Sequence, residues 1–384
     1  MNNTALIFGA GKTGRGFAAH LAFLGGYQII LIDKDHQLVN DLNSTLKYDI
    51  QILDREEKSV TINIEGAFYI EDAAWHEAFL TTDLAFTAVF GNNLKDLATS
   101  LAPALNKRHV ANPTGFLNII TCENLTNAAG VLKNAVKENL VPDKEEWLLN
   151  YIGFSESIIF RTCLNATADQ SPLTIRSQNF FELPCDGDAI KGDIHVYGLK
   201  PLKNFNNQLK RKIYTYNCIN AIITYLGAKK GYEQLYEAGN DPEILSIARK
   251  AGEEASGALI EEFGFDQQEQ QAWTDAAFAK FADKNIPDPI ERNAADPVRK
   301  LSREDRLIGP ALLALRHGIY PEGLIEGIIA CFDYRDETDH VSVAEMIQQK
   351  GLDVVLMEVC GLTEKEELFR LIKERAIKRS KDGK

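Results

Sequence analysis

The sequence predicts an α/β protein, with an N-terminal Rossmann-type, doubly wound sheet domain followed by an all-helical domain. Three observations predict this fold. A strand, a glycine-rich loop, a helix and a second strand occupy the first 33 residues. Short apolar runs typical of buried strands recur to about residue 175, and from about Asn204 the pattern becomes helical. Glycine and proline cluster at the change, so we expect a sheet domain over 1–195 and a helical domain over 196–384.

The first domain begins with a βαβ unit. Thr4–Phe8 is a short apolar run with the length of a buried parallel strand, and a glycine-rich loop and a helix over 17–24 follow it. Gly25 and Gly26 end that helix, and the apolar run 27–32 predicts a second strand. Two strands joined in this way form the right-handed unit from which Rossmann domains are built.

The remaining elements follow from the apolar patterns. We expect further strands at 60–64, 84–89, 117–121, 157–161 and 173–175. Long segments with almost no β-branched alternation between them predict helices at 206–229, 241–262, 267–282, 304–316, 321–332, 342–357 and 363–379.

Composition limits the class of function. The chain has 384 residues and a net charge of −13, which disfavours duplex nucleic acid or an anionic membrane as its partner. No apolar run approaches the roughly 18 residues of a membrane span, and the N-terminus resembles a strand rather than a signal peptide. We therefore expect a cytoplasmic protein that acts on a small molecule. The six cysteines stand far apart without a CxxC pair, so neither a disulfide framework nor a metal site is expected.

The first loop carries a dinucleotide-binding pattern. A GxGxxG motif directly follows a strand and opens a helix, and Asp33 comes 19 residues after its last glycine. The glycines permit a tight turn, close approach of a pyrophosphate and packing of helix on strand, and the helix N-terminus attracts phosphate. Asp33 would accept hydrogen bonds from the adenosine ribose and repel a 2′-phosphate, which favours NAD over NADP. FAD and a nucleotide-free turn are the alternatives. The predicted cofactor residues are Gly9, Ala10, Gly11, Lys12, Thr13, Gly14, Asp33, Ala88 and Val89.

Two polar clusters are candidates for chemistry. Lys212, Asn217 and Asn220 share a predicted helix, where about 100° per residue puts them within an arc of about 140°. Lys212 therefore needs its long stem, or a distortion of the helix, to meet the two amides. The second cluster, 121–124, follows a predicted strand at its carboxyl end, where open α/β sheets place ligands. On local grounds alone, a helix lysine is more often solvated, and Asn124 would more often be a turn residue.

The sequence resembles the polyol-specific long-chain dehydrogenases, the mannitol dehydrogenase family, over nearly its whole length. The family signature is a lysine, an asparagine five residues later and a histidine three beyond that. Lys212 and Asn217 match it, whereas Asn220 stands at the histidine position. The blocks that carry the resemblance are FGAGKTGRGF at 8–17, IITCENL at 119–125, IGF at 152–154, RKIYTYNCINAIITYLG at 211–227, DPVRKLSREDRLIGP at 296–310 and LIEGIIA at 324–330.

That resemblance implies a metal-free, NAD-dependent oxidation of a polyol. Lys212 would be the general base that takes the proton of the alcohol, while Asn124 and Asn217 would donate hydrogen bonds to the developing alkoxide. Asn220 could bind a substrate hydroxyl, but it cannot titrate between about pH 5 and 8 as a histidine can. The replacement implies either altered specificity or reduced activity, and both remain open.

Substrate recognition is expected from the basic segment 296–306. Arg299 and Lys300, with Arg306 as a third candidate, suit contacts to phosphate or hydroxyl groups. The alternative is an ordinary helix N-terminus with Ser302 as its cap. The resemblance favours interconversion of mannitol 1-phosphate and fructose 6-phosphate. The same cations would hold the carboxylate of a ketouronate such as tagaturonate or fructuronate, and a free polyol is a further alternative. A catalytically silenced NAD(H)-binding sensor is the alternative from a different class.

Overall fold

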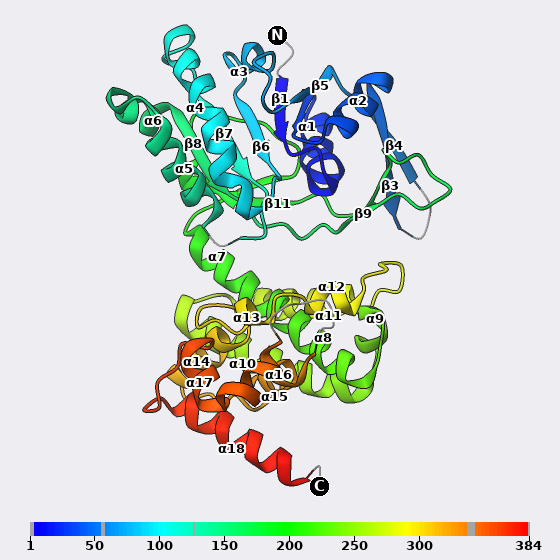
Figure 1. The fold of residues 1–384 in the computed structure, drawn as a ribbon, viewed down its shortest axis with the longest axis vertical. Helices are drawn as coiled ribbons and strands as arrows, with labels where there is room; N and C mark the ends of the chain where they lie inside the picture. Colours follow the sequence, from blue (N-terminus) through cyan, green and yellow to red (C-terminus); the bar gives the residue numbers. More distant parts are fainter. Residues whose placement is uncertain (1–3, 55–57, 126, 336–341, 383–384) are drawn as a thin grey trace. The chain divides into compact units, whose positions relative to one another are not determined.

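The computed structural model describes residues 4–54, 58–125, 127–335 and 342–382. The chain divides into two compact units after Asn206 (Figure 1). The division expected at 195 falls short of this point because β12 (Leu199–Leu202) pairs in parallel with β11 (Leu183–Asp186) of the first unit.

The first unit is built on a six-stranded parallel sheet. Its strand β1 has β2 on one side and β6 on the other, so the strand order reverses between β1 and β6. Doubly wound sheets bind ligands at such a reversal, outside the carboxyl ends of the strands. In spatial order the strands are β5 (Gly66–Tyr69), β2 (Gln28–Asp33), β1 (Thr4–Phe8), β6 (Leu84–Thr87), β7 (Leu117–Thr121) and β8 (Ile152–Glu156).

Both faces of this sheet are buried, as the uninterrupted apolar run of β1 predicts. Ala5 and Ile7 belong to one core cluster, and Leu6 and Phe8 belong to another. Helices complete both layers (Figure 1). They are α1 (Ala19–Leu24) and α2 (His36–Thr45) on the first face, and α3 (His76–Phe79), α4 (Leu94–Ala111), α5 (Ala128–Asn139) and α6 (Glu145–Tyr151) on the second.

A second, mixed sheet has the order β4 (Lys58–Asn63), β3 (Lys47–Leu53), β10 (Ile175–Gln178) and β9 (Cys163–Asn165). The strands expected at 60–64, 84–89 and 117–121 correspond to β4, β6 and β7.

The strand expected at 157–161 is wrong, because the edge strand of the large sheet is the preceding segment, β8. Gly153 weakens the strand pattern of β8 in the sequence. A Cβ at Gly153 would lie 2.4 Å from the Asn118 side chain, so the close packing there accepts only glycine. Beyond β8, Ser157 pairs with Cys185 in an isolated bridge that belongs to no named strand. Of the strand expected at 173–175, only the last residue lies in a strand, because β10 begins at Ile175.

The second unit is helical. Its helix α8 (Cys218–Lys230) packs on α10 (Pro242–Phe263), α12 (Ile290–Ala294) and α15 (Glu322–Asp333). Helix α10 begins at a regular N-cap, since Asp241 accepts the N–H groups of Glu243 and Ile244 at 2.9 and 3.0 Å. The other helices are α7 (Phe205–Lys212), α9 (Leu235–Ala238), α11 (Gln267–Phe281), α13 (Pro297–Lys300), α14 (Ile308–Arg316), α16 (Val343–Lys350), α17 (Leu352–Glu358) and α18 (Glu367–Asp382).

Three of the expected helices differ from the structure, and one of them, expected at 363–379, starts only at Glu367. The helix expected at 342–357 is two helices, α16 and α17, because Gly351 between them has a φ of 89° that a continuous helix cannot contain. The helix expected at 304–316 starts only at Ile308, since the residues before it form turns.

Candidate active site

The glycine loop lies at the carboxyl end of β1, beside the end of β6. A Cβ at Gly9 would lie 2.3 Å from the carbonyl oxygen of Ala88, and one at Gly14 would lie 1.8 Å from that of Gly9. Nothing lies within 4 Å of a Cβ built at Gly11, so the backbone there is open to a ligand. Helical structure starts directly afterwards, at Lys12 and Thr13. The first N–H groups of a helix have no partner within it, and such a helix start binds phosphate.

Asp33 fixes the loop from the neighbouring strand. Its Oδ2 accepts the N–H of Ala10 at 2.6 Å, and its Oδ1 accepts the N–H of Asp35 at 3.0 Å. Nε of Arg15 donates to the carbonyl oxygen of Ala10 at 2.7 Å and so fixes the same residue of the loop. The half-buried carboxylate keeps further lone pairs, so it can also accept hydrogen bonds from ribose hydroxyls.

A pocket of the first unit brings together five of the predicted cofactor residues. Apolar side chains form one part of its wall, and the glycine loop and the Asp33 carboxylate form another. This combination fits the purine, the ribose and the pyrophosphate of a dinucleotide. The lining includes Gly9, Gly11, Asp33, Ala88 and Val89 together with Ile32, Ile70 and Leu97.

Glu123 holds the loop that follows β6. Its Oε1 accepts the hydroxyl of Thr87 at 2.9 Å and the N–H of Val89 at 3.1 Å, and burial raises its pKa. Sequence reasoning placed Glu123 in the polar cluster after β7 but gave it no role. The available signal was an acid shortly after a buried strand. Asn124, the residue after Glu123, lies exposed in the loop that follows β7.

Lys212 lies at a distortion of its helix. Helix α7 ends there and continues through a π-helical turn, Ile213–Asn217, into α8. Hydrogen bonds that span five residues instead of four bring residues five apart nearer to the same face. The π-turn therefore narrows the angle of about 140° that would separate Lys212 from Asn217 in a regular α-helix. Turns of this kind are frequent at functional sites.

The environment of Lys212 lowers its pKa from 10.5 to about 7. Although part of the residue remains exposed, burial around the ammonium group is the largest cause. The positive charges of Arg306, Lys280 and Arg299 add to the effect, and the charge of Asp305 opposes it. A lysine with this pKa is about half neutral at pH 7 and can accept a proton, which an ordinary lysine rarely can.

The two amides that follow Lys212 have different partners. Both are half-buried. Within the described ranges, no hydrogen bond to another side chain or to the backbone engages the Asn217 amide, which leaves it available to a ligand. Asn220 donates through Nδ2 to Oδ1 of Asn293 at 3.2 Å.

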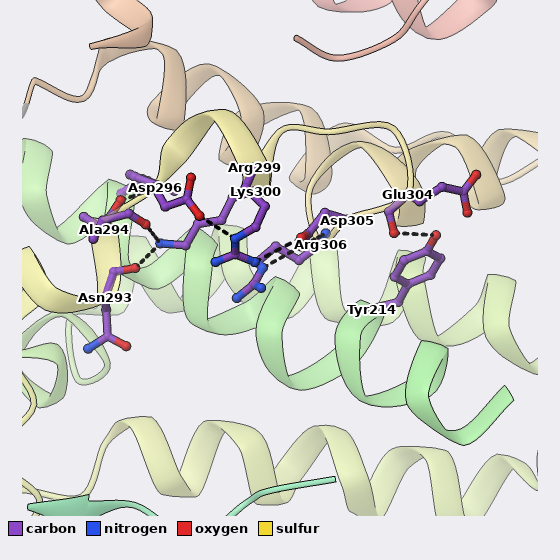
Figure 2. Close-up of polar contacts among 11 residues, drawn as sticks. Tyr214, Asn293, Ala294, Asp296, Arg299, Lys300, Glu304, Asp305 and Arg306 are labelled. Carbon is purple, nitrogen blue, oxygen red and sulfur yellow. Dashed lines mark hydrogen bonds and ion pairs between the residues drawn. The ribbon is translucent and has the colours of Figure 1, made fainter. Parts of the chain in front are cut away.

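The basic segment forms the cluster of side chains drawn in Figure 2. Arg299 and Lys300 belong to the short helix α13 rather than to a loop, and Ser302 does not cap a helix. Lys300 is buried, and its ammonium donates to the carbonyl oxygens of Asn293, at 2.5 Å, and Ala295. Burial, followed by the charge of Arg306, lowers the pKa of Lys300 to about 8.

Asp305 joins the two arginines of this cluster (Figure 2). It accepts from Nε of Arg306 at 2.7 Å and from Nη1 of Arg299 at 3.2 Å. Arg299 is exposed and also pairs with Asp296 at 2.5 Å. Arg306 is buried, and among the described contacts its guanidinium donates only through Nε. Its two terminal amino groups can therefore serve a bidentate contact with an anion.

The predicted basic residues of the second unit therefore influence one another electrostatically. Arg306 lowers the pKa of both Lys212 and Lys300, so it lies within reach of both. Sequence reasoning missed Lys280 and the bridging role of Asp305. Lys280 comes from α11, and nothing in its local sequence distinguishes it from the other lysines.

The structure adds no metal site and no membrane-spanning helix to this description. No group of three or more His, Cys, Asp or Glu side chains in the described ranges is placed to hold a metal ion. None of the helices that the structure describes is long and apolar enough to span a membrane.

Comparison with protein families matches both halves of the chain. The family model described as the mannitol dehydrogenase Rossmann domain matches residues 3–196, and the one described as the mannitol dehydrogenase C-terminal domain matches 204–378. A curated mannitol-1-phosphate 5-dehydrogenase from Thermoanaerobacter pseudethanolicus is 32% identical over 96% of this chain and 96% of its own length. One from Bacillus pumilus is 31% identical over 96% of this chain and 98% of its own.

Solved structures share the fold. Pseudomonas fluorescens mannitol 2-dehydrogenase, in a ternary complex with NAD and D-mannitol, has a TM-score of 0.77 at 16% identity, and the match covers 100% of this chain and 92% of that one. A substrate-free D-sorbitol dehydrogenase has a TM-score of 0.79 at 14% identity, with coverage of 99% and 94%. Family models span both units, and relatives above 30% identity span nearly the whole sequence. The chain therefore belongs to the mannitol dehydrogenase family, as its motifs indicate, and is an NAD-dependent dehydrogenase.

Proposed function

We propose that this dehydrogenase interconverts mannitol 1-phosphate and fructose 6-phosphate without a metal ion, with Lys212 as the general base. The observation that carries the proposal is the position of Lys212, with a pKa of about 7, directly before a π-helical turn that ends at Asn217. The curated relatives that span the chain are mannitol-1-phosphate 5-dehydrogenases, which supports the substrate pair.

The chemistry assigned to the chain is one proton transfer and the stabilisation of one oxyanion. In the oxidation of the polyol, neutral Lys212 takes the proton of the reacting hydroxyl at Nζ. Asn217 would donate a hydrogen bond to the oxygen as negative charge develops on it, and the family resemblance implies the same role for Asn124. Losing one such donor typically slows an enzyme by about 10²–10³-fold. Bound NAD would supply the acceptor for the hydride that leaves the carbon bearing this hydroxyl.

The first unit is proposed to hold NAD through the residues that line its pocket. The backbone at Gly11 and the helix start at Lys12 and Thr13 would bind the pyrophosphate. Asp33 would accept the adenosine ribose hydroxyls, and Ala88 and Val89 would pack against the dinucleotide. Of the other predicted loop residues, Ala10 is tied to Asp33 through its N–H, and Gly14 leaves room for the backbone of Gly9.

Arg306 and Arg299 are proposed to bind the substrate phosphate. The chain has a net charge of −13, so an anionic substrate needs a local basic cluster such as this one. Arg306 keeps two terminal amino groups for the contact, and Asp305 orients both guanidinium groups. Lys300 would act on the phosphate only as a nearby positive charge, because two of its three donors already bind backbone carbonyls.

The test compares substrates. NADH consumption is followed with fructose 6-phosphate, fructose and tagaturonate, in the wild type, in Arg306→Gln and in the control Arg303→Gln. Arg303 lies in the same segment but is exposed and pairs with Glu366, outside this cluster. We expect fructose 6-phosphate to be the best substrate. Arg306→Gln should raise its KM about 10–100-fold, the usual loss for a charged hydrogen bond, and leave the KM for fructose unchanged.

Three other results would contradict the proposal. Preference for tagaturonate would make the protein a ketouronate reductase, and equal use of fructose would make it a free-polyol dehydrogenase. NADH binding without turnover of any substrate would favour a silenced sensor. The retention of Lys212, Asn217 and Asn124 argues against that last outcome, because a silenced site has no need of a base beside two amide donors.

A further inference from the structure

Asn220 belongs to a chain of three hydrogen-bonded side chains. Its Nδ2 donates to Oδ1 of Asn293 at 3.2 Å, and Nδ2 of Asn293 donates to Oδ1 of Asp288 at 2.6 Å. Asn220 lies on α8, and the other two residues come from the segment that leads into and forms α12, the helix packed against α8. We call this series the Asp288 relay.

The direction of the hydrogen bonds in the relay is fixed from its Asp288 end. A carboxylate only accepts, so Asn293 must turn its NH₂ group toward Asp288. The same NH₂ group also donates to the carbonyl oxygen of Pro289 at 3.0 Å, which again only accepts. Both hydrogens of the Asn293 amide are therefore used, and its oxygen must face Asn220.

Asn220 is oriented in turn. Facing an oxygen, it must present its NH₂ group to Asn293, and its own Oδ1 points to the other side of the amide group. Within the described part of the chain, this oxygen accepts no hydrogen bond, and Asn220 is only half-buried.

We propose that the Asp288 relay makes Asn220 a fixed hydrogen-bond acceptor for a hydroxyl group of the polyol chain of the substrate, with Asn293 and Asp288 as positioning residues. This inference rests on the proposed function. A histidine at the same position could donate or accept and would change its charge near neutral pH. The oriented amide of Asn220 accepts from the substrate at every pH at which the fold persists.

The backbone of the relay is held as firmly as its side chains. The buried ammonium of Lys300 donates to the carbonyl oxygens of Asn293 and Ala295, and so ties this end of α12 to the charged cluster. Asp288 is 8% exposed and also pairs with Arg292, whose Nε lies 2.9 Å from its Oδ1. An amide held in this way loses little entropy when it binds a ligand.

The test exchanges donor and acceptor in the hydrogen bond between position 220 and Asn293. Asn220→Asp puts two acceptors face to face, so the urea midpoint of unfolding should fall and the KM for fructose 6-phosphate should rise about tenfold. Asp288→Asn removes the shorter of the two hydrogen bonds that orient Asn293. Its amide can then rotate, at the cost of the bond to the Pro289 carbonyl oxygen, and donate to the new carboxylate at position 220. The double variant should therefore recover at least half of the midpoint that Asn220→Asp loses.

Asp288→Asn alone should raise the KM for fructose 6-phosphate several-fold while kcat and the KM for NADH stay within twofold. Arg292→Gln is the matched control, because it removes the ion pair to Asp288 but leaves the relay its carboxylate. Arg292→Gln should keep all three kinetic constants within twofold of the wild type.

Two results would overturn the proposal. Strictly additive midpoints in the double variant would show that the three side chains are not coupled. Coupled midpoints with an unchanged KM in every variant would show a relay that only packs α12 on α8. The unfolding measurements need no turnover, so they report on the relay even if the wild type fails to reduce fructose 6-phosphate, which would refute the proposed function separately.

Discussion

Replacing Lys212 by methionine should abolish activity and make the protein more stable. The pKa of Lys212 is about 7 in the folded protein, against the ordinary value of 10.5 that the unfolded chain provides. At about 1.36 kcal/mol per pH unit, the folded state disfavours the charged form by about 5 kcal/mol. Methionine keeps most of the length of the side chain and removes the charge, so it should relieve most of this penalty.

The size of this stabilisation depends on pH. Between about pH 7 and 10.5 the unfolded chain carries the Lys212 proton and the folded protein does not, so stability rises with pH in this window. The penalty is complete below about pH 7 and disappears above 10.5. Lys212→Met should therefore raise the free energy of unfolding by about 2–4 kcal/mol at pH 7.5 and by almost nothing near pH 10.5.

Urea unfolding at these two pH values measures the difference. Lys210→Met is the control, because Lys210 lies on the same helix but is exposed and pairs with Glu304 at 3.4 Å. It should not stabilise the protein at either pH. Equal stabilisation by Lys212→Met at both pH values, or none at pH 7.5, would refute the claim that burial and neighbouring cations lower this pKa. In the wild type, kcat/KM for polyol oxidation should rise with pH and level off above a midpoint near 7.

Three further predictions concern the cofactor loop and the buried lysine. Gly11→Ala should fold normally and weaken NADH binding, because nothing in the protein lies within 4 Å of the added Cβ. Gly14→Ala should lower the melting temperature, because its Cβ would lie 1.8 Å from the carbonyl oxygen of Gly9. Thermal unfolding with and without NADH separates the two effects. Asp33→Asn should reduce the preference for NADH over NADPH at least about tenfold, measured as the ratio of kcat/KM values, because the repulsion of the 2′-phosphate is lost. Lys300→Met should lower the unfolding free energy by about 2–3 kcal/mol near pH 10.5, where the charge penalty behind its lowered pKa has disappeared, since it leaves two backbone carbonyls without their donor. An unchanged urea midpoint at that pH would contradict this.

The local parts of the fold could be predicted from the sequence. The run Thr4–Phe8 and the glycine loop after it identify the first strand and its ligand end, because a buried parallel strand and a tight phosphate turn each depend on neighbouring residues. Strand β8 could not be found in this way. Its Gly153 is required by contacts with Asn118 and Ala189, which are distant in sequence, and a glycine weakens any local strand signal.

The geometry of the candidate site also could not be predicted from local sequence. The spacing of Lys212 and Asn217 indicated that either the long stem of the lysine or a distortion of the helix was needed, but a π-turn has no residue signature that would have located it. Arg299 and Lys300 are adjacent and looked equivalent in the sequence. On a helix, neighbours point about 100° apart, and here one side chain is exposed while the other is buried on backbone carbonyls.

Lys212 is proposed to be the base of an NAD-dependent oxidation of mannitol 1-phosphate and the acid of the reverse reduction of fructose 6-phosphate. The most direct measurement follows NADH absorbance with purified protein and fructose 6-phosphate, in the wild type and in Lys212→Ala. We expect NADH consumption by the wild type and a loss of at least about 10²-fold in kcat in the variant, with NADH binding retained. Equal rates in the two proteins, or no NADH consumption by the wild type, would contradict it.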